Sequence, residues 1–202
     1  DICTREAFVN AARIVAATGG STNAALHLPA MASEAGIEFD LFDVAEVFKS
    51  TPYAADLKPG GKYVAKDMYE AGGVYMLMKT MLANGLLYGD CMTVTGKTLG
   101  ENIDQVTWNP DQKVIYDVKT PITPTGGVVG LRGSLAPNGA IVKVAGMARL
   151  QFEGPARCFD CEEDAFAAVE ARSIQEGEVV VIRYEGPKGG PGMREMLSTT
   201  AA

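Results

Sequence analysis

The sequence predicts an α+β protein in which a helical first half is followed by a strand-rich second half. Up to about residue 100, apolar residues recur at the three- and four-residue spacing of amphipathic helices. Beyond residue 112, short runs rich in Val and Ile alternate with Gly, Pro and Asn, as in strands joined by turns. We therefore expect a boundary between residues 104 and 112, and we divide the chain into domains 1–108 and 109–202.

The first half is expected to contain five helices. Ser21 or Thr22 would cap the second helix, and Asp40 or Asp43 the third, because these side chains accept hydrogen bonds from the first amides of a helix. The last helix is rich in Met, which we interpret as core filler rather than as a cofactor site. The expected helices span 7–17, 23–35, 44–49, 63–70 and 74–83.

The second half is expected to contain strands at 114–118, 127–131, 140–144 and 179–184. One amphipathic helix, 161–172, lies between the last two, with Asp160 as a possible N-cap. The run 179–184 is almost entirely apolar, which indicates a buried strand. Strands with an intervening helix favour an α+β or β/β/α layered domain.

Composition excludes some partners. The formal net charge is −7, and no basic stripe is present to neutralise phosphates, so we expect no nucleic-acid partner. No apolar run approaches the length that spans a bilayer, so we expect no membrane partner. The small number and wide scatter of the four cysteines argue against a disulfide scaffold and for reduced thiols.

The remaining reactive side chains give only weak indications of a functional site. Cys158 and Cys161 have CxxC spacing, but without a second pair or a nearby His we interpret them as incidental thiols. The single histidine, His27, lies in an apolar helical segment and is interpreted as structural, although a Ser-His-Asp arrangement around it stays open. The G-K-T at residues 96–98 has Cys91 where a P-loop needs its first glycine, which argues against nucleotide binding.

Two glycine-containing segments are better candidates for a site. Residues 184–195 combine a preceding strand, a Gly/Pro loop and an expected helix start, a common place to hold an anion. Glu195 in that first turn is either a capping acid or a ligand for a hard cation. The turn at Gly19–Gly20, followed by Ser21, Thr22 and Asn23, presents backbone amides at a helix start. It is either an N-cap alone or a site for a substrate carboxylate.

Five segments together resemble the dihydroxy-acid dehydratase and phosphogluconate dehydratase family. They follow one another in the family's order across nearly the whole chain, and their residues most resemble those of the dihydroxy-acid dehydratases. The segments are 18–28 (TGGSTNAALHL), 56–63 (DLKPGGKY), 89–99 (GDCMTVTGKTL), 133–140 (GSLAPNGA) and 185–195 (EGPKGGPGMRE).

The resemblance implies a hydro-lyase that converts a 2,3-dihydroxy carboxylic acid into a 2-keto acid, as in branched-chain amino-acid biosynthesis. It implies an iron–sulfur cluster, [2Fe-2S] or [4Fe-4S], that acts as Lewis acid on the departing C3 hydroxyl, and a Mg²⁺ ion that holds the carboxylate. A deprotonated serine would remove the C2 proton. It also implies that residues 1–108 end the cluster-bearing helical domain and that 109–202 begin a swivelling β-rich domain.

Carried over by position, the resemblance assigns one metal ligand, Glu195, to Mg²⁺. Ser21, Thr22 and Asn23 are candidates for substrate binding. Cluster ligands and the serine base are expected outside residues 1–202, so we expect an internal fragment that is inactive alone. A homodimer in the cytoplasm, or in a plastid for a eukaryotic source, is also implied. A sugar-acid (aldonate) dehydratase and a non-catalytic interaction domain remain as alternatives.

Overall fold

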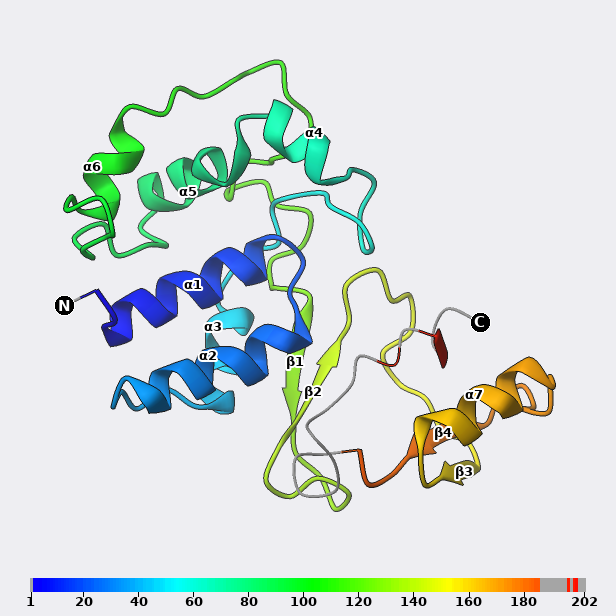
Figure 1. Cartoon of the computed structure of the whole chain (residues 1–202). Helices are drawn as coiled ribbons and strands as arrows, with labels where there is room; N and C mark the ends of the chain where they lie inside the picture. Colours follow the sequence, from blue (N-terminus) through cyan, green and yellow to red (C-terminus); the bar gives the residue numbers. More distant parts are fainter. Residues whose placement is uncertain (1, 186–195, 197, 200–202) are drawn as a thin grey trace. The chain divides into compact units, whose positions relative to one another are not determined.

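The computed structural model describes residues 2–185, 196 and 198–199. They form two compact units, Asp1–Ala148 and Arg149–Ala202. Within the described residues, the first unit contains six helices and a two-stranded hairpin, and the second contains two strands and one helix (Figure 1). This mixture of helices and small sheets confirms the predicted α+β class. No described helix is both long and apolar enough to cross a membrane.

One layer of the first unit packs three helices over a hairpin. Its core joins Phe8 and Ala12 of the first helix with Val44 and Phe48 of the third, and with Val128 of the hairpin. The hairpin is antiparallel, with Val128 opposite Lys143. The elements are α1 (Arg5–Ala17), α2 (Thr22–Glu34), α3 (Leu41–Lys49), β1 (Val128–Leu131) and β2 (Ala140–Lys143).

A second core lies on the other side of α1, between α1 and α5 (Figure 1). Met76, Leu77 and Met81 are almost completely buried there against Ala17 at the end of α1. The interpretation of the Met-rich helix as core filler is thereby confirmed. The elements on this side are α4 (Ala65–Glu70), α5 (Gly73–Ala83) and α6 (Leu99–Asp104).

Side-chain caps fix where several helices begin. Asp40 accepts hydrogen bonds from the amides of Phe42 and Asp43, at 2.8 and 3.0 Å, and the Asp43 carboxylate accepts one from the Asp40 amide. This capping box settles which of the two acids caps α3. Thr98 and Glu101 form the same arrangement at α6, a helix that the sequence pattern did not predict.

The expected strand at 114–118 is wrong. Its amides at Val114 and Ile115 bind the side-chain oxygen of Gln112, at 2.9 and 2.7 Å, which removes them from any ladder. Only an isolated bridge between Ile115 and Ala55 forms. The segment is therefore extended chain packed in the second core rather than a strand of a sheet.

The second unit is a strand–helix–strand motif, in which β3 and β4 pair in parallel with Ala156 opposite Val179. The predicted N-cap Asp160 is wrong, because the structure places Cys161 at that position and Asp160 pairs with Arg183 instead. The predicted burial of the last strand is also wrong, since Val179 is exposed and its neighbours are half-buried. The elements are β3 (Ala156–Phe159), α7 (Glu162–Glu170) and β4 (Val179–Ile182).

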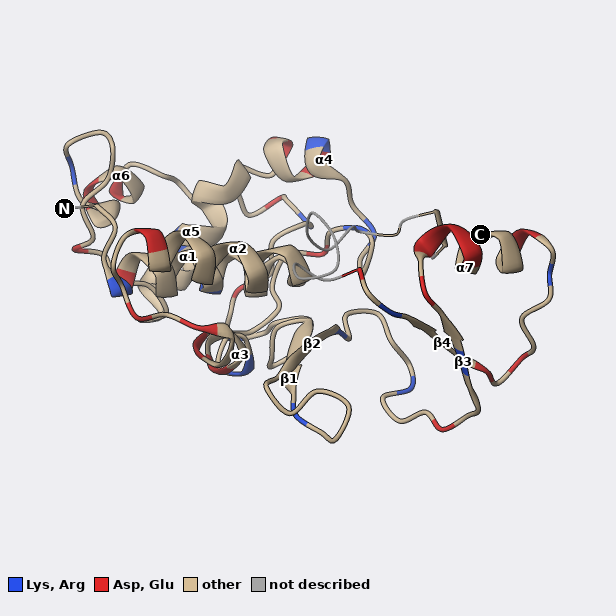
Figure 2. Ribbon diagram, turned by 60° about the horizontal axis from the view of Figure 1, so that its bottom comes forward, with Lys and Arg blue, Asp and Glu red and all other residues tan. Residues whose placement is uncertain are grey.

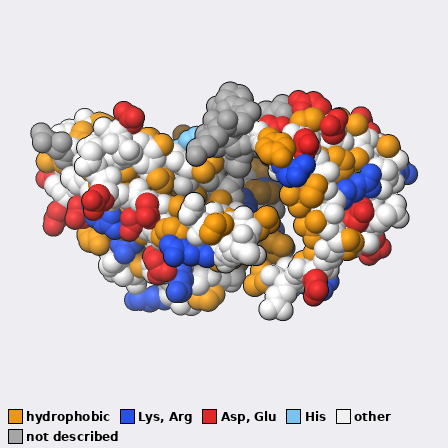
Figure 3. Space-filling model, turned by 90° about the horizontal axis from the view of Figure 1, so that it is seen from below, with side chains coloured by type: hydrophobic (Ala, Val, Ile, Leu, Met, Phe, Trp, Pro, Cys, Tyr) orange, Lys and Arg blue, Asp and Glu red, His pale blue; other side chains and the backbone are white. Residues whose placement is uncertain are grey.

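Charge is distributed unevenly over the described surface. Figure 2 shows acidic side chains gathered on the first turn of α7, where Glu162, Glu163 and Asp164 lie. Their position is favoured by the helix dipole. On the face that Figure 3 presents, Lys and Arg are mixed with acids and apolar atoms. This mixture is typical of an ordinary solvated surface.

Candidate functional site

Three glycine segments of the first unit meet at one place, which we call the glycine junction: Gly19–Gly20, Gly60 and Gly126–Gly127, with Tyr53 and Ala145 between them. Gly19–Gly20 is the turn from α1 to α2, and Gly126–Gly127 leads into β1. Main chain approaches main chain here because glycine has no Cβ.

Two of the contacts at the junction are too close for any side chain. A methyl group on Gly127 would lie 2.2 Å from the Gly19 carbonyl oxygen and 2.5 Å from Cβ of Ala145. A methyl group on Gly20 would lie 2.5 Å from Cγ2 of Val128, and Gly20 also has a φ of +80°, which side chains disfavour. The start of α2 is therefore fixed against the entry to the hairpin by contacts that require glycine.

Tyr53 joins the first and second glycine segments. Its side chain is buried, and its ring would lie 3.2 Å from a methyl group on Gly19, while its hydroxyl would lie 3.6 Å from one on Gly60. Burial, and then the Asp56 carboxylate, raises the pKa of the Tyr53 hydroxyl. The hydroxyl therefore stays protonated and donates to the carbonyl of Leu57 at 3.4 Å.

The loop 56–63 is closed by a buried carboxylate. Asp56 is 7% exposed, and its Oδ1 accepts a hydrogen bond from the Lys62 amide at 3.2 Å. The carbonyl of Asp56 accepts from the Tyr63 amide at 2.9 Å. A methyl group on Gly61 would lie 2.4 Å from Oδ1 of Asp56, so this turn also depends on glycine.

Ser21, Thr22 and Asn23 are brought together at the beginning of α2, beside the glycine junction. Ser21 is the N-cap residue, but its side chain makes no capping hydrogen bond. The first turn of α2 contains no acidic residue. A helix start of this kind, with a hydroxyl not engaged in capping and no competing carboxylate, suits the binding of a carboxylate.

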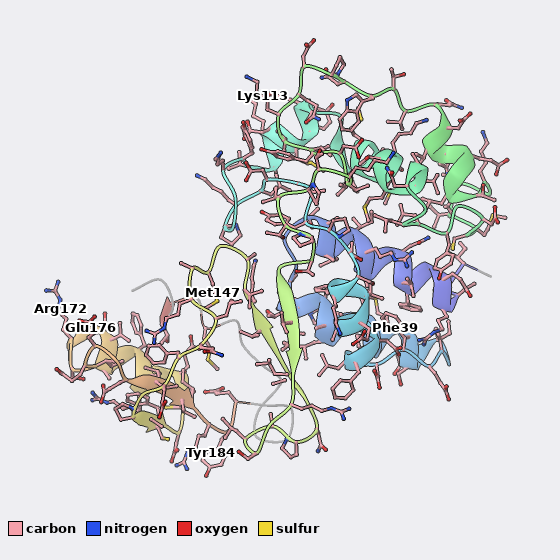
Figure 4. All side chains as sticks on the ribbon, turned by 180° about the vertical axis from the view of Figure 1, so that it is seen from behind. Phe39, Lys113, Met147, Arg172, Glu176 and Tyr184 are labelled. Carbon is pink, nitrogen blue, oxygen red and sulfur yellow. The ribbon has the colours of Figure 1, made fainter. Side chains whose placement is uncertain are left out.

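Glu195 and its Gly/Pro loop lie outside the described residues. The described chain leads up to this loop through Tyr184, which is 65% exposed and has a φ of 62° (Figure 4). The assignment of Glu195 to Mg²⁺ therefore stays a prediction.

The described side chains do not fit an iron–sulfur cluster or a Mg²⁺ site. In the part of the chain that the structure describes, no three His, Cys, Asp or Glu side chains gather in a group that could hold a metal ion. Burial, with Glu6 and Asp90 adding to it, raises the pKa of the Cys91 thiol, which disfavours the thiolate that a metal needs. Cys3 and Cys158 are exposed free thiols.

The Cys161 thiol has a pKa above its ordinary value. A hydrogen bond from the Asp164 amide lowers this pKa, but burial and the carboxylates of Asp164 and Glu163 raise it by more. These two neighbouring acids thus leave Cys161 a poor nucleophile.

The structure also places His27 and the G-K-T segment. His27 is exposed on α2, so its interpretation as a structural histidine stays a prediction. The segment 92–98 is a hairpin closed by a bridge between Met92 and Thr98, and Thr98 caps α6. Its G-K-T therefore forms a tight turn and a helix cap.

Sequence reasoning missed Tyr53, Asp56 and Gly127. The glycine pair at 126–127 and the glycine pair at 60–61 were the signals that could have indicated close packing. Their shared partner, Tyr53, carries no sequence signal because the contact depends on tertiary structure.

Family models match the chain in two parts. Residues 1–102 match the model described as dihydroxy-acid/6-phosphogluconate dehydratase N-terminal, and residues 113–202 match its C-terminal counterpart. The expected boundary at residues 108 and 109 lies between the matched segments, and the domain division itself stays a prediction.

Similar proteins match over the entire chain. Dihydroxy-acid dehydratase 2 of Bradyrhizobium diazoefficiens is 72% identical over 202 residues, which is 100% of this chain and 35% of the relative. Dihydroxy-acid dehydratase of Parvibaculum lavamentivorans is 69% identical over 204 residues, which cover 100% of this chain and 35% of the relative. Dihydroxy-acid dehydratase of Saccharolobus islandicus is 53% identical over 204 residues, which cover 100% of this chain and 37% of the relative. The chain thus spans about a third of the length of these curated relatives.

Proposed function

Because this chain belongs to the dihydroxy-acid/6-phosphogluconate dehydratase family, we propose that a longer protein containing it, the parent, removes water from a 2,3-dihydroxy carboxylic acid to give a 2-keto acid. The observation that carries the proposal is 72% identity over the whole chain to a dihydroxy-acid dehydratase. The relatives described above have this name rather than that of a sugar-acid dehydratase. From the family resemblance, we propose a methyl-branched dihydroxy acid of branched-chain amino-acid biosynthesis as the substrate.

The proposal includes an iron–sulfur cluster and Mg²⁺ in the parent. The described residues do not supply a ligand set for either group. On the family resemblance, we place the cluster ligands and the serine base elsewhere in the parent, and we assign Glu195 as a Mg²⁺ ligand. An oxygen ligand suits this hard cation.

The part that we assign to the described residues is substrate positioning. Ser21, Thr22 and Asn23 would bind the substrate carboxylate at the start of α2, using the amides of the first turn and the Ser21 hydroxyl. The glycine junction would hold this turn in place, since Gly127 touches the carbonyl of Gly19 next to it. A positioned carboxylate fixes which carbon faces the catalytic base.

We further propose a homodimer in the cytoplasm, or in a plastid for a eukaryotic source. Residues 1–108 would end the cluster-bearing helical domain, and residues 109–202 would belong to the swivelling β-rich domain. These proposals rest on the family resemblance and on the two matched segments.

The test is keto-acid formation by the purified parent from 2,3-dihydroxy-3-methylbutanoate and, separately, from an aldonate. We expect turnover of the branched acid and little of the aldonate, and no turnover by residues 1–202 alone. Preference for the aldonate would favour the sugar-acid alternative. A parent that contains iron and sulfide but turns over neither acid would contradict the proposal.

The role of Glu195 is tested by Glu195→Gln in the parent, which we expect to abolish activity and Mg²⁺ dependence together. Glu176→Gln is the matched control, because Glu176 is an exposed acid in the second unit (Figure 4). An active Glu195→Gln protein with normal Mg²⁺ dependence would refute the assignment while leaving the proposed reaction intact.

A further inference from the structure

The join between the two matched family segments lies inside the first unit. Residues 1–102 match the N-terminal family model, and residues 113–202 match the C-terminal one. The first unit nevertheless continues to Ala148. It therefore includes residues 113–148, which we call the hairpin segment because β1 and β2 lie within it. This first part of the C-terminal match is folded together with the helices (Figure 1).

Main-chain hydrogen bonds tie the beginning of the hairpin segment to the chain that follows α3. The Asp56 amide donates to the Val114 carbonyl at 2.9 Å, and the Tyr116 amide donates to the Ala54 carbonyl at 2.8 Å. Ala54, Asp56 and Val114 are all buried. Separating the two pieces of chain would break these bonds and open the interior around them.

The hairpin itself packs into the core formed by α1 and α3. Val128 is 2% exposed and belongs to the same apolar cluster as Phe48. The Gly126 amide donates to the Phe48 carbonyl at 2.9 Å, and a methyl group on Gly130 would lie 2.6 Å from Cβ of Ala45 in α3. The hairpin could not leave these helices without exposing their apolar core to water.

The end of the hairpin segment closes the glycine junction. The amides of Val144 and Ala145 donate to the Gly127 carbonyl, at 2.7 and 3.1 Å. A methyl group on Gly60 would lie 3.2 Å from Cβ of Ala145, and Gly127 contacts the carbonyl of Gly19. The junction therefore combines glycines of the N-terminal match with residues of the hairpin segment.

These contacts end after Ala148. Residues 148–153 are all exposed, and no main-chain hydrogen bond involves them within the described part of the chain. Close packing begins again at Gly154, where a methyl group would overlap the Gly177 carbonyl oxygen. The Val179 amide then donates to the Pro155 carbonyl at 2.9 Å. Residues 148–153 thus connect two bodies, each of which is held together by its own contacts.

We infer that the hairpin segment is a fixed part of the helical domain, and that the part of the chain able to move as a separate body begins at Arg149. Rotation within residues 148–153 breaks none of the hydrogen bonds described above, whereas displacement of the hairpin segment breaks buried bonds and opens an apolar core. Of the residues assigned above to the swivelling domain, only those from Arg149 onward then change position. The inference rests on that proposed domain and not on the proposed reaction.

The inference has a consequence for the candidate site. A movement that begins after Ala148 leaves the glycine junction closed, so the turn that carries Ser21 stays in place. Movement of the whole C-terminal match would instead pull Gly127 away from Gly19 and release this turn.

The test is hydrogen exchange in the parent, followed by mass spectrometry of peptides. Val128→Ala removes two methyl groups from the core that the hairpin shares with α1 and α3. We expect peptides of α1, α3 and the hairpin segment to exchange at least about fivefold faster, and residues 156–182 to be unchanged. Val181→Ala in β4 is the matched control and should accelerate only residues 156–182.

The opposite pattern would overturn the inference. If the hairpin segment belonged to the moving body, Val128→Ala would accelerate residues 156–182 and leave α1 and α3 unchanged. In the unchanged parent, peptides covering residues 148–153 should exchange at about the rate of an unfolded chain. Protection of these peptides by more than about tenfold would contradict a hinge at this place.

A milder variant keeps the test available if Val128→Ala prevents folding. Ile141→Val removes one methyl group from a side chain that packs against the same core, and it should give the same pattern with about a twofold acceleration. None of these measurements requires turnover. Failure of the proposed reaction would therefore leave the inference standing, and failure of the inference would leave the proposed reaction intact.

Discussion

Replacing Gly127 with alanine should destabilise the first unit strongly, because the glycine junction leaves no space for a methyl group. The added Cβ would lie 2.2 Å from the carbonyl oxygen of Gly19 and 2.5 Å from Cβ of Ala145. Overpacking a core typically costs about 1–3 kcal/mol. We expect a value near the upper end, about 3 kcal/mol, because the nearest neighbour is main chain rather than the flexible end of a side chain.

The assay is thermal unfolding followed by circular dichroism, for which about 3 kcal/mol corresponds to a fall of roughly 6–12 °C in Tm for a protein of this size. Gly133→Ala is the matched control, because a methyl group there meets no heavy atom within 4 Å and Gly133 has no left-handed φ. A Gly127→Ala protein that unfolds within about 2 °C of the Gly133→Ala protein would refute the close contact and the junction built on it.

Two further predictions concern the helices beside the junction. Asp40→Ala should cost about 1 kcal/mol in unfolding free energy, since two amides lose their cap, whereas Ser21→Ala should cost little because Ser21 makes no capping bond. Denaturant titrations of both variants check this, and equal losses would contradict it. The pKa of Asp43 lies below its ordinary value of 3.8, first because Arg5 donates a hydrogen bond to it. Its contribution to stability is therefore fully present above pH 3.8 and is lost as the pH falls through the lowered value, so Arg5→Met should flatten the acid side of the stability profile.

The helices of the first unit were predictable because their signals are local. The apolar spacing of 7–17 and the capping acids at 40 and 43 depend on residues within one or two turns, and the structure places α1 and α3 there. Helix α6 was not predicted because its capping box of Thr98 and Glu101 overlaps the G-K-T sequence, which was examined only as a possible P-loop.

The incorrect strand predictions in the second half of the chain have non-local causes. The segment 114–118 has the composition of a strand, but the Gln112 side chain binds two of its amides, and composition does not show that competition. The run 179–184 is apolar enough for a buried strand, yet the described part of its sheet contains only β3 beside it. Burial depends on how many layers cover a strand, which the strand's own residues do not determine.

The candidate site was predictable in part for the same reason. Ser21, Thr22 and Asn23 follow a glycine pair, so the local sequence predicted a helix start there. The structure places these residues at the start of α2. The glycine junction beside them could not be predicted from the sequence, because Tyr53 and Gly127 are distant in sequence from Gly19 and contact it only after folding.

Two of the segments that resemble the family, TGGSTN and DLKPGGKY, contribute Gly19, Gly20 and Gly60 to one junction. A methyl group on Gly19 would lie 3.2 Å from the Tyr53 ring, one on Gly20 would lie 2.5 Å from Cγ2 of Val128, and one on Gly60 would lie 3.2 Å from Cβ of Ala145. Gly19 and Gly20 also have positive φ values, so a side chain at either position is strained as well as crowded. The fold therefore constrains these two positions more tightly than Gly60, where a shift of a few tenths of an ångström would admit a methyl group.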